Sequence, residues 1–580
     1  MCGIAGVVAP YAGRHAGAVD AMLAALRHRG PDGTGVVDLG GCVLGATRLA
    51  VMDLDRGAQP MVHVDGTSAV AFNGEVYGHR RLRDGLRYPF RTTCDTEVLL
   101  ALHDARGERF VEDLPGMFAY ALWDGRRGRL LCGRDRFGEK PFFWTRGPDG
   151  AFAFASEVGA LLASGFVDEV VDEVALAHHL AHARIPTDRS IFRDIHVLAP
   201  AHRLAVRSDG TPSDPVRYWK PPPRWDAMDA AVAAEDVRGA LDVAVADQLV
   251  ADVPVGAFLS GGLDSGSVVA AAAPRHPQLH TFSLGFGGPG DETAAAEAQA
   301  EHLGTVHHAV RPADVDKVAF LRRLARVYGE PHGDASAIPT LLLSEAAREH
   351  VTVALTGDGA DELLGGYLYW SRHHLAHQDV PLPRSLGGPG PDPTEPGRLL
   401  AAYRGFRRYL DDDRLAALGV VLPPPSPPSS RATGTVSDLL LHDLEGYLPG
   451  GILVKTDRAS MAVGLELRSP FLDRRVAELC LSLPETLLVD RHGDKLVLRA
   501  AMAERLAPGV VERDKRGFAG PMAAWLGDPV VADYGRELLA PLASLIEPEA
   551  AAAVLDGGGQ AAWNVLVLGV WAEARPRARR

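Results

Sequence analysis

The sequence predicts a strand-rich α+β domain over residues 2–210, followed by an α/β domain with a parallel sheet over residues 225–580. Three observations lead to this prediction. At 580 residues the chain is too long for a single hydrophobic core. Short β-like runs dominate the first 205 residues, whereas helical patterns alternate with compact apolar strands later in the chain. The segment 208–223 is too rich in Pro and Gly to hold regular structure, so we place the domain boundary there.

Local patterns predict the individual elements. In the first domain, apolar runs bounded by turn residues predict strands at 42–44, 69–72, 118–123 and 151–155. In the second domain, the patterns predict a helix at 230–249 and strands at 256–259, 280–284 and 351–355. Two Pro-rich stretches, at 381–397 and 422–430, are expected to be surface insertions in the second domain.

Composition and charge argue against several classes of protein. Lys and Arg number 60 against 74 Asp and Glu, and the net charge of −14 argues against a nucleic-acid partner. No stretch approaches the roughly 18 apolar residues of a membrane span, and no signal-peptide pattern is present, so we expect a cytoplasmic protein without a membrane partner. The five cysteines include no CxxC pair, which argues against a disulfide framework and a zinc site. The histidine doublets at 178–179, 307–308 and 373–374 lack the HExxH spacing, so we expect ordinary polar positions there.

Cys2 directly follows the initiator methionine. Cysteine is small enough for methionine removal, which would leave a thiol and a free α-amine on the same residue. The α-amine has a reference pKa of about 8, so its neutral fraction can take the thiol proton and activate the nucleophile. Its position alone is weak evidence that Cys2 is a nucleophile, because a cysteine without a function could occupy position 2 by chance.

The motifs that follow Cys2 give this position its context. They are MCGIAG at 1–6, RHRGPDG at 27–33, NGEVY at 73–77, CDTE at 94–97, RDRFGEKP at 134–141 and FASE at 154–157. In this order the set resembles the class II glutamine amidotransferases, which are N-terminal nucleophile hydrolases, over residues 2–205. The resemblance implies a four-layer αββα sandwich that hydrolyses the side-chain amide of glutamine.

The resemblance also implies roles for individual residues. Cys2 matches the thiol nucleophile that attacks glutamine, which gives a thioester and ammonia. The Asn73 side-chain amide and the Gly74 backbone N–H match the oxyanion hole, where one donor is worth about 3 kcal/mol. The glutamine-binding residues implied in this way are Arg48, Val51, Asn73, Gly74, Glu75 and Asp95.

The charges of this set suit glutamine. Arg48 matches the clamp on the substrate α-carboxylate, a task suited to a bidentate guanidinium. Glu75 and Asp95 match the acceptors for the α-ammonium. The family usually has His-Arg before the clamp arginine and Ser before the second acid, whereas this chain has Ala-Thr at 46–47 and Cys94. Both departures leave the charged groups in place, so glutamine binding should survive.

In the second domain, the strand expected at 256–259 leads into SGGLDS at 260–265, and a helical pattern follows. Consecutive N–H groups of a Gly-rich turn and a helix N-terminus bind anionic oxygens, and the two serine hydroxyls add donors. The segment matches neither GxxxxGK[ST] nor GxGxxG. It resembles the pyrophosphate-binding PP-loop of the ATP pyrophosphatases, which implies an adenine nucleotide alpha hydrolase-like fold and cleavage of ATP to AMP and pyrophosphate.

Two carboxylates are candidate ligands for Mg²⁺. Asp264 lies inside this loop, and Asp361 lies in LTGDGADEL at 355–363, where a second strand leads into a Gly- and Asp-rich turn. The carboxyl ends of parallel strands meet at one sheet edge, so both carboxylates should lie near the polyphosphate. Helix capping is the alternative for either residue alone, but two such turns after two strands favour a metal–nucleotide site.

Four further segments complete the match. They are SAIPT at 336–340, KTDRASMA at 455–462, RSPFLD at 468–473 and DKRGF at 514–518. With them the chain resembles the glutamine-hydrolysing asparagine synthetases from end to end, apart from the Pro-rich insertions. Asp358 matches a residue that helps to form the acyl-adenylate, and Lys515 matches the lysine that meets charge developing in adenylation and amide formation. The ATP-binding residues implied are Leu259, Ser260, Gly261, Gly262, Asp264, Ser265, Leu284, Thr356 and Gly357.

Some positions keep two interpretations. Lys455, Arg458 and Arg468 suit salt bridges between domains or helices as well as they suit substrate contact. We interpret 134–141 as a turn that packs the first domain. Gly266 replaces a serine that is usual in the family, which removes one side-chain donor and should weaken nucleotide binding slightly at most.

We therefore expect an ATP- and Mg²⁺-dependent ligase that amidates aspartate to asparagine, through an acyl-adenylate, with ammonia released from glutamine and passed internally. AMP, pyrophosphate and glutamate would be the other products. The motifs do not fix the acceptor acid, so an amide ligase acting on another carboxylic acid in specialised metabolism is the alternative. A nucleic-acid-modifying pyrophosphatase or a non-catalytic scaffold would need neither Cys2 nor the glutamine clamp. The oligomeric state is not readable from the sequence, and a homodimer is an open expectation.

Overall fold

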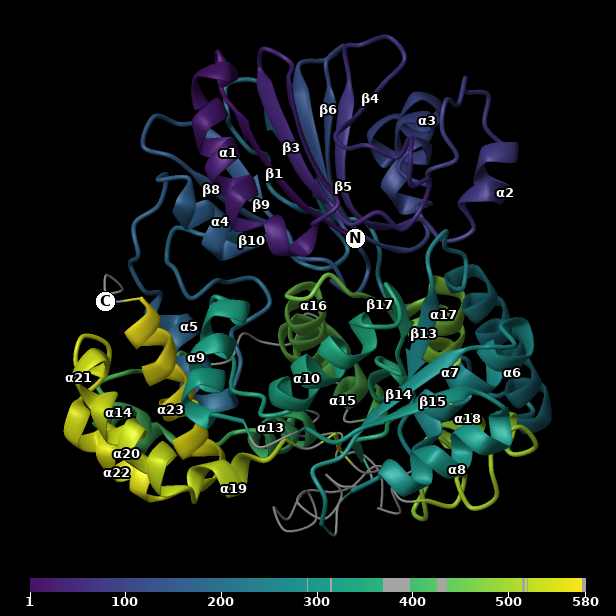
Figure 1. The fold of residues 1–580 in the computed structure, drawn as a ribbon, viewed down its shortest axis with the longest axis vertical. Helices are drawn as coiled ribbons and strands as arrows, with labels where there is room; N and C mark the ends of the chain where they lie inside the picture. The colour runs from purple at the N-terminus through teal and green to yellow at the C-terminus, as the bar shows by residue number, and fades with distance from the viewer. Residues whose placement is uncertain are drawn as a thin grey trace.

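Two six-stranded antiparallel sheets pack face to face in the N-terminal part of the chain (Figure 1). The computed structural model describes residues 1–288, 291–312, 315–368, 397–424, 435–513, 517–518, 520–575 and 580. The first sheet contains β1 (Cys2–Val8), β2 (Gly33–Asp38), β3 (Cys42–Arg48), β8 (Phe143–Arg146), β9 (Phe152–Ala155) and β10 (His196–Val197). The second contains β4 (Met61–Val62), β5 (Ala69–Glu75), β6 (Met117–Asp124), β7 (Arg129–Arg134), β11 (His202–Arg207) and β12 (Val216–Arg217).

Helices cover the outer faces of both sheets. α1 (Ala16–Ala25) and α4 (Val158–Ala163) pack on the first sheet. α3 (Glu97–Arg106) packs on the second, with α2 (His79–Asp84) beside it (Figure 1). Strands between these layers have both faces covered, and every residue of β5 and β6 is buried. The predicted four-layer αββα sandwich is confirmed.

The observed strands run beyond the predicted apolar segments where polar residues extend them. The segment 69–72 becomes β5 by the addition of Asn73, Gly74 and Glu75, which pair with β6 and are buried. The expectation that 208–223 holds no regular structure is wrong at one point. Val216–Arg217 forms β12 there, because it adds to the exposed edge of β11.

A five-stranded parallel sheet forms the centre of the second part, as predicted. Its order is β15-β14-β13-β16-β17, with β13 (Val255–Phe258), β14 (His280–Leu284), β15 (Val306–Val310), β16 (Val353–Leu355) and β17 (Glu466–Arg468). Helices around it include α6 (Ala230–Gln248), α7 (Leu263–Ala272), α8 (Thr293–Leu303), α10 (Ala337–Arg348), α11 (Ala360–Leu364), α17 (Arg474–Ser482) and α18 (Leu496–Met502). The loops after β13, β14 and β16 therefore share one edge of the sheet.

The remaining described helices lie along the chain between the sheet strands or after them. They are α9 (Lys317–Tyr328), α13 (Arg398–Phe406), α14 (Asp412–Ala417), α15 (Val436–His442), the π-helical η6 (Asp443–Ile452) and α16 (Leu453–Met461). The C-terminal helices are α19 (Met522–Leu526), α20 (Pro529–Glu537), α21 (Leu539–Leu542), α22 (Pro548–Asp556) and α23 (Gly559–Ala574). The predicted insertions at 381–397 and 422–430 lie almost entirely outside the described residues.

The two parts of the chain share a hydrophobic core. α5 (Glu173–His182) comes from the first 205 residues, yet it packs beside α23 and α14 at the C-terminal end of the molecule (Figure 1). The ring of Trp571 lies 5.7 Å from that of Phe192, and Asn564 donates its side-chain N–H to the carbonyl of Leu180. The chain therefore crosses between the two parts in space more than once, which its order in sequence does not reveal.

Buried ion pairs also join the two parts. Arg29 is fully buried and donates to both oxygens of Asp457 in α16, at 2.8 and 2.9 Å. It also donates to Glu157, and Arg458 Nη1 forms an ion pair with the same carboxylate at 2.7 Å. Arg458 therefore makes an inter-domain salt bridge, one of the two interpretations that the sequence left open.

Candidate active sites

Cys2 is the first residue of β1, in the centre of the first sheet. Its thiol is buried and receives an N–H from Gln59 at 3.4 Å. Its backbone N–H donates to Asn73 Oδ1 at 3.1 Å. Burial raises the pKa of the Cys2 thiol, although the Met1 amino group, Leu49 N–H and Arg48 oppose that shift. The thiol therefore needs a base beside it to react at neutral pH. Gln59 belongs to no motif and was not predicted.

The predicted oxyanion donors lie next to this thiol. Because Asn73 Oδ1 accepts from Cys2, its Nδ2 points elsewhere, and among the described residues this buried nitrogen has no hydrogen-bond partner. Gly74 has a φ of +156°, and a Cβ there would lie 2.1 Å from the carbonyl oxygen of Met117. Only glycine fits that turn of the backbone. An unsatisfied donor in a buried site is suited to an oxygen that gains charge during reaction.

Arg48 ends β3, the strand that pairs with β1. Its guanidinium donates to the carbonyls of Met52, Asp53 and Leu54 at 2.7 to 3.0 Å. These bonds hold the guanidinium in place and use part of its five-donor fork, so an approaching carboxylate meets a preoriented cation. The neighbouring Val51 is buried, and its carbonyl accepts from Asp252 in the second domain.

Glu75 and Asp95 are buried carboxylates that lie close enough to interact electrostatically. Asp95 accepts from the backbone N–H of Val76 at 2.8 Å. Burial raises the pKa of Glu75 well above its usual range, and the charge of Asp95 raises it further. Two buried acids that repel one another gain from a cation between them, which is the property expected of a pocket for an α-ammonium.

The N-terminus also contacts the second domain. The Met1 amino group lies 2.6 Å from Glu466 in β17. Glu466 accepts from Arg468 at 2.7 Å, and Arg468 lies 3.5 Å from Glu75. Arg468 therefore makes a buried contact between the domains, as one of its two sequence interpretations proposed.

The SGGLDS segment forms the turn after β13 and the first three residues of α7. Ser260 and Ser265 place their hydroxyls 2.9 Å apart, and the Ser265 hydroxyl accepts from the backbone N–H of Ser260. A Cβ on Gly357, in the loop after β16, would lie 2.8 Å from the nitrogen of Ser265. The two loops approach closely only because position 357 is glycine.

Asp264 and Asp361 converge on one cation, which is the ammonium of Lys495. Lys495 Nζ lies 2.6 Å from Asp264 and 2.5 Å from Asp361. Its backbone has a φ of +51°, and a side chain on Gly366 would collide with its stem. Two carboxylates that focus on one position are a donor set that fits Mg²⁺. Lys495 was not predicted, because it precedes a helix and carries no motif.

The other predicted nucleotide residues surround the same loops. Leu259 N–H donates to the carbonyl of Phe282, and Thr356 N–H donates to that of Arg468 at 2.8 Å. The Thr356 hydroxyl donates to Asp358 at 2.9 Å. Lys515 lies outside the described residues, so its role stays a prediction.

These residues line a cavity of about 630 Å³, a size typical of ligand sites. All nine predicted ATP-binding residues line it, together with Asp358 and Asp361. Lys455 also lines it, and its ammonium donates to Ser336 at 3.0 Å and lies 3.7 Å from Asp334. The sequence left two interpretations for Lys455, Arg458 and Arg468. Of these three residues, only Lys455 lines the cavity.

Gly266 has a steric explanation. A Cβ there would lie 1.8 Å from the side-chain nitrogen of Gln299 in α8, which is fully buried. The space that a serine would fill is taken by this glutamine. Glycine at position 266 therefore accommodates Gln299, and the hydroxyls of Ser260 and Ser265 are still present in the loop.

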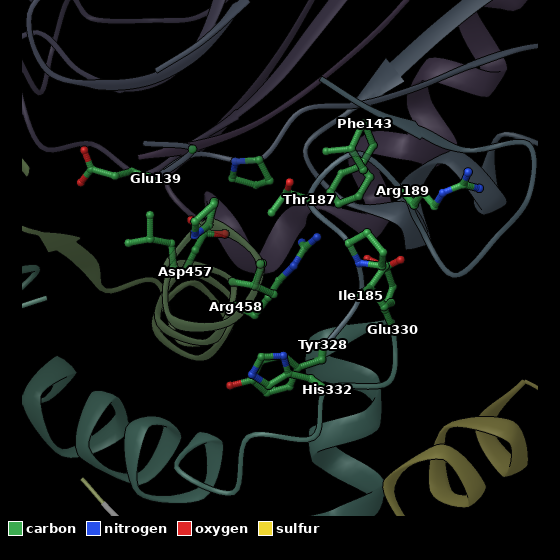
Figure 2. A pocket seen from close by; sticks show the side chains of 18 of the residues that line it. Glu139, Phe143, Ile185, Thr187, Arg189, Tyr328, Glu330, His332, Asp457 and Arg458 are labelled. Carbon is green, nitrogen blue, oxygen red and sulfur yellow. The ribbon is translucent and has the colours of Figure 1, made fainter. Parts of the chain in front are cut away.

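A second, smaller cavity lies between the two domains (Figure 2). Its volume is about 60 Å³, and Glu139 and Phe143 line it from the N-terminal side, while Asp457 and Arg458 line it from α16. Lys455 and Thr456 of the same helix line the nucleotide cavity. α16 thus separates the two cavities.

Comparison with known proteins identifies the family. Residues 1–219 match the glutamine amidotransferase domain, and residues 236–573 match asparagine synthase. A protein of Mycobacterium tuberculosis, provisionally named a glutamine-hydrolysing asparagine synthetase, is 35% identical over 91% of this chain and 88% of its own length. The chain belongs to the glutamine-hydrolysing asparagine synthetase family. Asparagine synthetases 1 and 3 of Bacillus subtilis are 31% and 32% identical, covering 86% and 89% of this chain and 83% and 87% of their own lengths.

As a member of the asparagine synthetase family, the protein is a glutamine-dependent, amide-forming ligase that uses ATP. Within the described residues, none of the helices combines the length and apolar character needed to span a bilayer.

Proposed function

We propose that this member of the family converts aspartate to asparagine, with nitrogen from glutamine and energy from ATP. The observation that carries the proposal is the pairing of two sites in one chain. Cys2 and its unsatisfied oxyanion donor form the first, and a PP-loop with two convergent carboxylates forms the second.

Glutamine hydrolysis would take place at Cys2. Removal of Met1 turns the backbone nitrogen of Cys2 into an α-amine, which can accept the thiol proton. Arg48 would hold the substrate α-carboxylate, and Glu75 and Asp95 its α-ammonium. The thiolate attacks the side-chain carbonyl, Asn73 and Gly74 stabilise the oxyanion, and the amine returns its proton to the departing ammonia.

Adenylation of the acceptor would take place in the larger cavity. A carboxylate is a poor electrophile, and bonding it to the α-phosphate of ATP supplies AMP as a leaving group. The turn at 260–265 would hold the pyrophosphate portion through backbone N–H groups and serine hydroxyls. Asp264 and Asp361 would hold Mg²⁺, which when bound offsets polyphosphate charge. Asp358, fixed by Thr356, and Lys515 keep their proposed roles in adenylation.

Ammonia would then move from the first site to the second. The inter-domain cavity supports an internal route, because Asp457, the partner of Arg29, lines it and because α16 lines both this cavity and the ATP cavity. Its volume of about 60 Å³ exceeds the roughly 10–15 Å³ that a water-sized molecule needs.

The wall around Lys455 supports an amino acid as acceptor. Lys455 and Asp334 present opposite charges 3.7 Å apart at the cavity surface. Burial opposes ionisation of Asp334, but Lys455 and His332 hold the pKa of that carboxyl below its usual value, so it remains charged. A zwitterion such as aspartate can bind to both charges, its carboxylate to Lys455 and its ammonium to Asp334, whereas a simple carboxylic acid can bind only to Lys455.

Pyrophosphate release measured with a panel of acids would test the proposal. We expect release to depend on aspartate, with asparagine formed from either glutamine or added ammonia. Succinate, which lacks the α-ammonium, is the matched control and should support little release. An enzyme that is silent with aspartate but active with another acid would refute the proposal in favour of specialised amidation.

A further inference from the structure

Three histidines from separate segments meet on one face of the parallel sheet. His280 is the first residue of β14, His308 lies in β15, and His350 follows the end of α10. One ring nitrogen of each lies within 4.8 Å of those of the other two. The glutamine and ATP chemistry described above uses none of these side chains.

Strand pairing creates this meeting point. His308 pairs with Phe282 across the two parallel strands, and His280 shares the face of Phe282 because side chains alternate along a strand. His280 Nδ1 and His308 Nε2 lie 2.9 Å apart. The His308 ring stacks on Phe282 with centroids 4.9 Å apart. The His350 ring stacks on the His308 ring with centroids 4.2 Å apart.

The chemistry of the cluster suits a metal ion. Neutral imidazole is a common ligand for Zn²⁺, at about 2.1 Å from the ion. Two of the nitrogens already have nearly the separation of neighbouring ligands. His350 is exposed, and rotation of its side chain can bring the third nitrogen closer.

We propose that His280, His308 and His350 form a binding site for one transition-metal ion of the Zn²⁺ class. Imidazole nitrogen favours such ions, whereas the carboxylates Asp264 and Asp361 favour Mg²⁺, so the two sites differ in ligand preference. In the cluster as described, one of His280 and His308 donates an N–H to the other. On binding, that ring carries its proton on its other nitrogen and offers a lone pair to the ion, while water takes the fourth position.

Binding would tie three elements together. The ion would bridge edge strand β15, its neighbour β14 and the end of α10, in addition to the backbone pairing of the two strands and the stacking of the His350 ring on that of His308. Phe282, whose ring stacks with that of His308, also lines the nucleotide cavity. This site departs from the sequence expectation for the doublet at 307–308, because His280 and His350 are distant from His308 in sequence.

Zn²⁺ titration of the full chain by calorimetry tests the site. Every protein carries Cys2→Ala, so that the catalytic thiol does not compete, and excess Mg²⁺ occupies oxygen ligands. The test variant adds His350→Ala, which removes an exposed ligand with little risk to folding. The matched control adds His302→Ala, which removes an exposed histidine at the end of α8, outside the cluster.

We expect one Zn²⁺ per chain in the reference protein and the His302 control, with affinity at least about tenfold weaker after His350→Ala. Zn²⁺ should also raise the melting temperature of the first two proteins more than that of the third. Co²⁺ in place of Zn²⁺ should give the visible bands of nitrogen ligation. Equal affinity in all three proteins, equal loss in both histidine variants, or no stoichiometric binding would overturn the proposal.

Discussion

Asn73 should contribute to glutamine hydrolysis through both ends of its side-chain amide. Its oxygen holds the nitrogen of Cys2 at 3.1 Å, and its buried nitrogen has no partner among the described residues. Loss of one oxyanion donor costs about 2.7–4 kcal/mol, and loss of a neutral hydrogen bond about 1 kcal/mol. Asn73→Ala should therefore lower the kcat of glutamine hydrolysis by about 10³-fold or more.

Asn73→Asp separates these two contributions. Aspartate keeps an oxygen for Cys2 but replaces the donor with a second acceptor, so it should be at least as inactive as alanine. The assay is glutamate release as a function of glutamine concentration, with ammonia-dependent pyrophosphate release as the control for folding. A raised KM with unchanged kcat would refute the oxyanion role, because it would assign Asn73 to ground-state binding. Equal loss of the ammonia-dependent reaction would instead indicate damage to the fold.

Three other outcomes follow from the geometry. Cys2→Ala should abolish glutamine-dependent synthesis and preserve synthesis from ammonia, measured as asparagine formed; loss of both would contradict two separate sites. Asp361→Asn should suppress pyrophosphate release while glutamate release persists, and near-normal ATP turnover would rule out the proposed metal site. Arg29→Met should lower the free energy of unfolding by roughly 3 kcal/mol at pH 7, because it removes the guanidinium that donates to both oxygens of the buried Asp457 carboxylate and leaves only Lys140, at 3.9 Å, as an ion-pair partner among the described residues. Arg29 holds the pKa of Asp457 below its usual value against burial, so this stabilisation is present above about pH 4 and declines as the pH falls further. Denaturant midpoints that change equally with pH in both proteins would contradict it.

Motifs located the chemical groups of both sites, since each motif names a residue and its local turn. The alternation of strand and helix in the sequence also predicted the parallel sheet, because few topologies are compatible with that pattern. Asp264 and Asp361 could be paired in advance for the same reason. The strands that precede them are neighbours and run parallel, so the loops that follow these strands lie at the same edge of the sheet.

Residues that act through distant contacts could not be found in this way. Gln59 contacts the thiol across 57 positions, and Lys495 reaches Asp264 across 231. Neither has a local pattern that sets it apart from a surface residue. The histidine doublet at 307–308 was interpreted from its own spacing alone, yet the partners of His308 come from another strand and a helix end. Such sets depend on strand register, which a single sequence does not display.

The position of the Lys495 ammonium between two carboxylates has a consequence for the buffers that the protein tolerates and for the way in which it binds its nucleotide. Two carboxylates that face each other without a cation between them would repel one another. Here the chain supplies its own positive charge at 2.6 Å from Asp264. We therefore expect the loops to stay assembled in a chelating buffer. The nucleotide and its ion should arrive together, with the lysine released to turn toward the incoming phosphates.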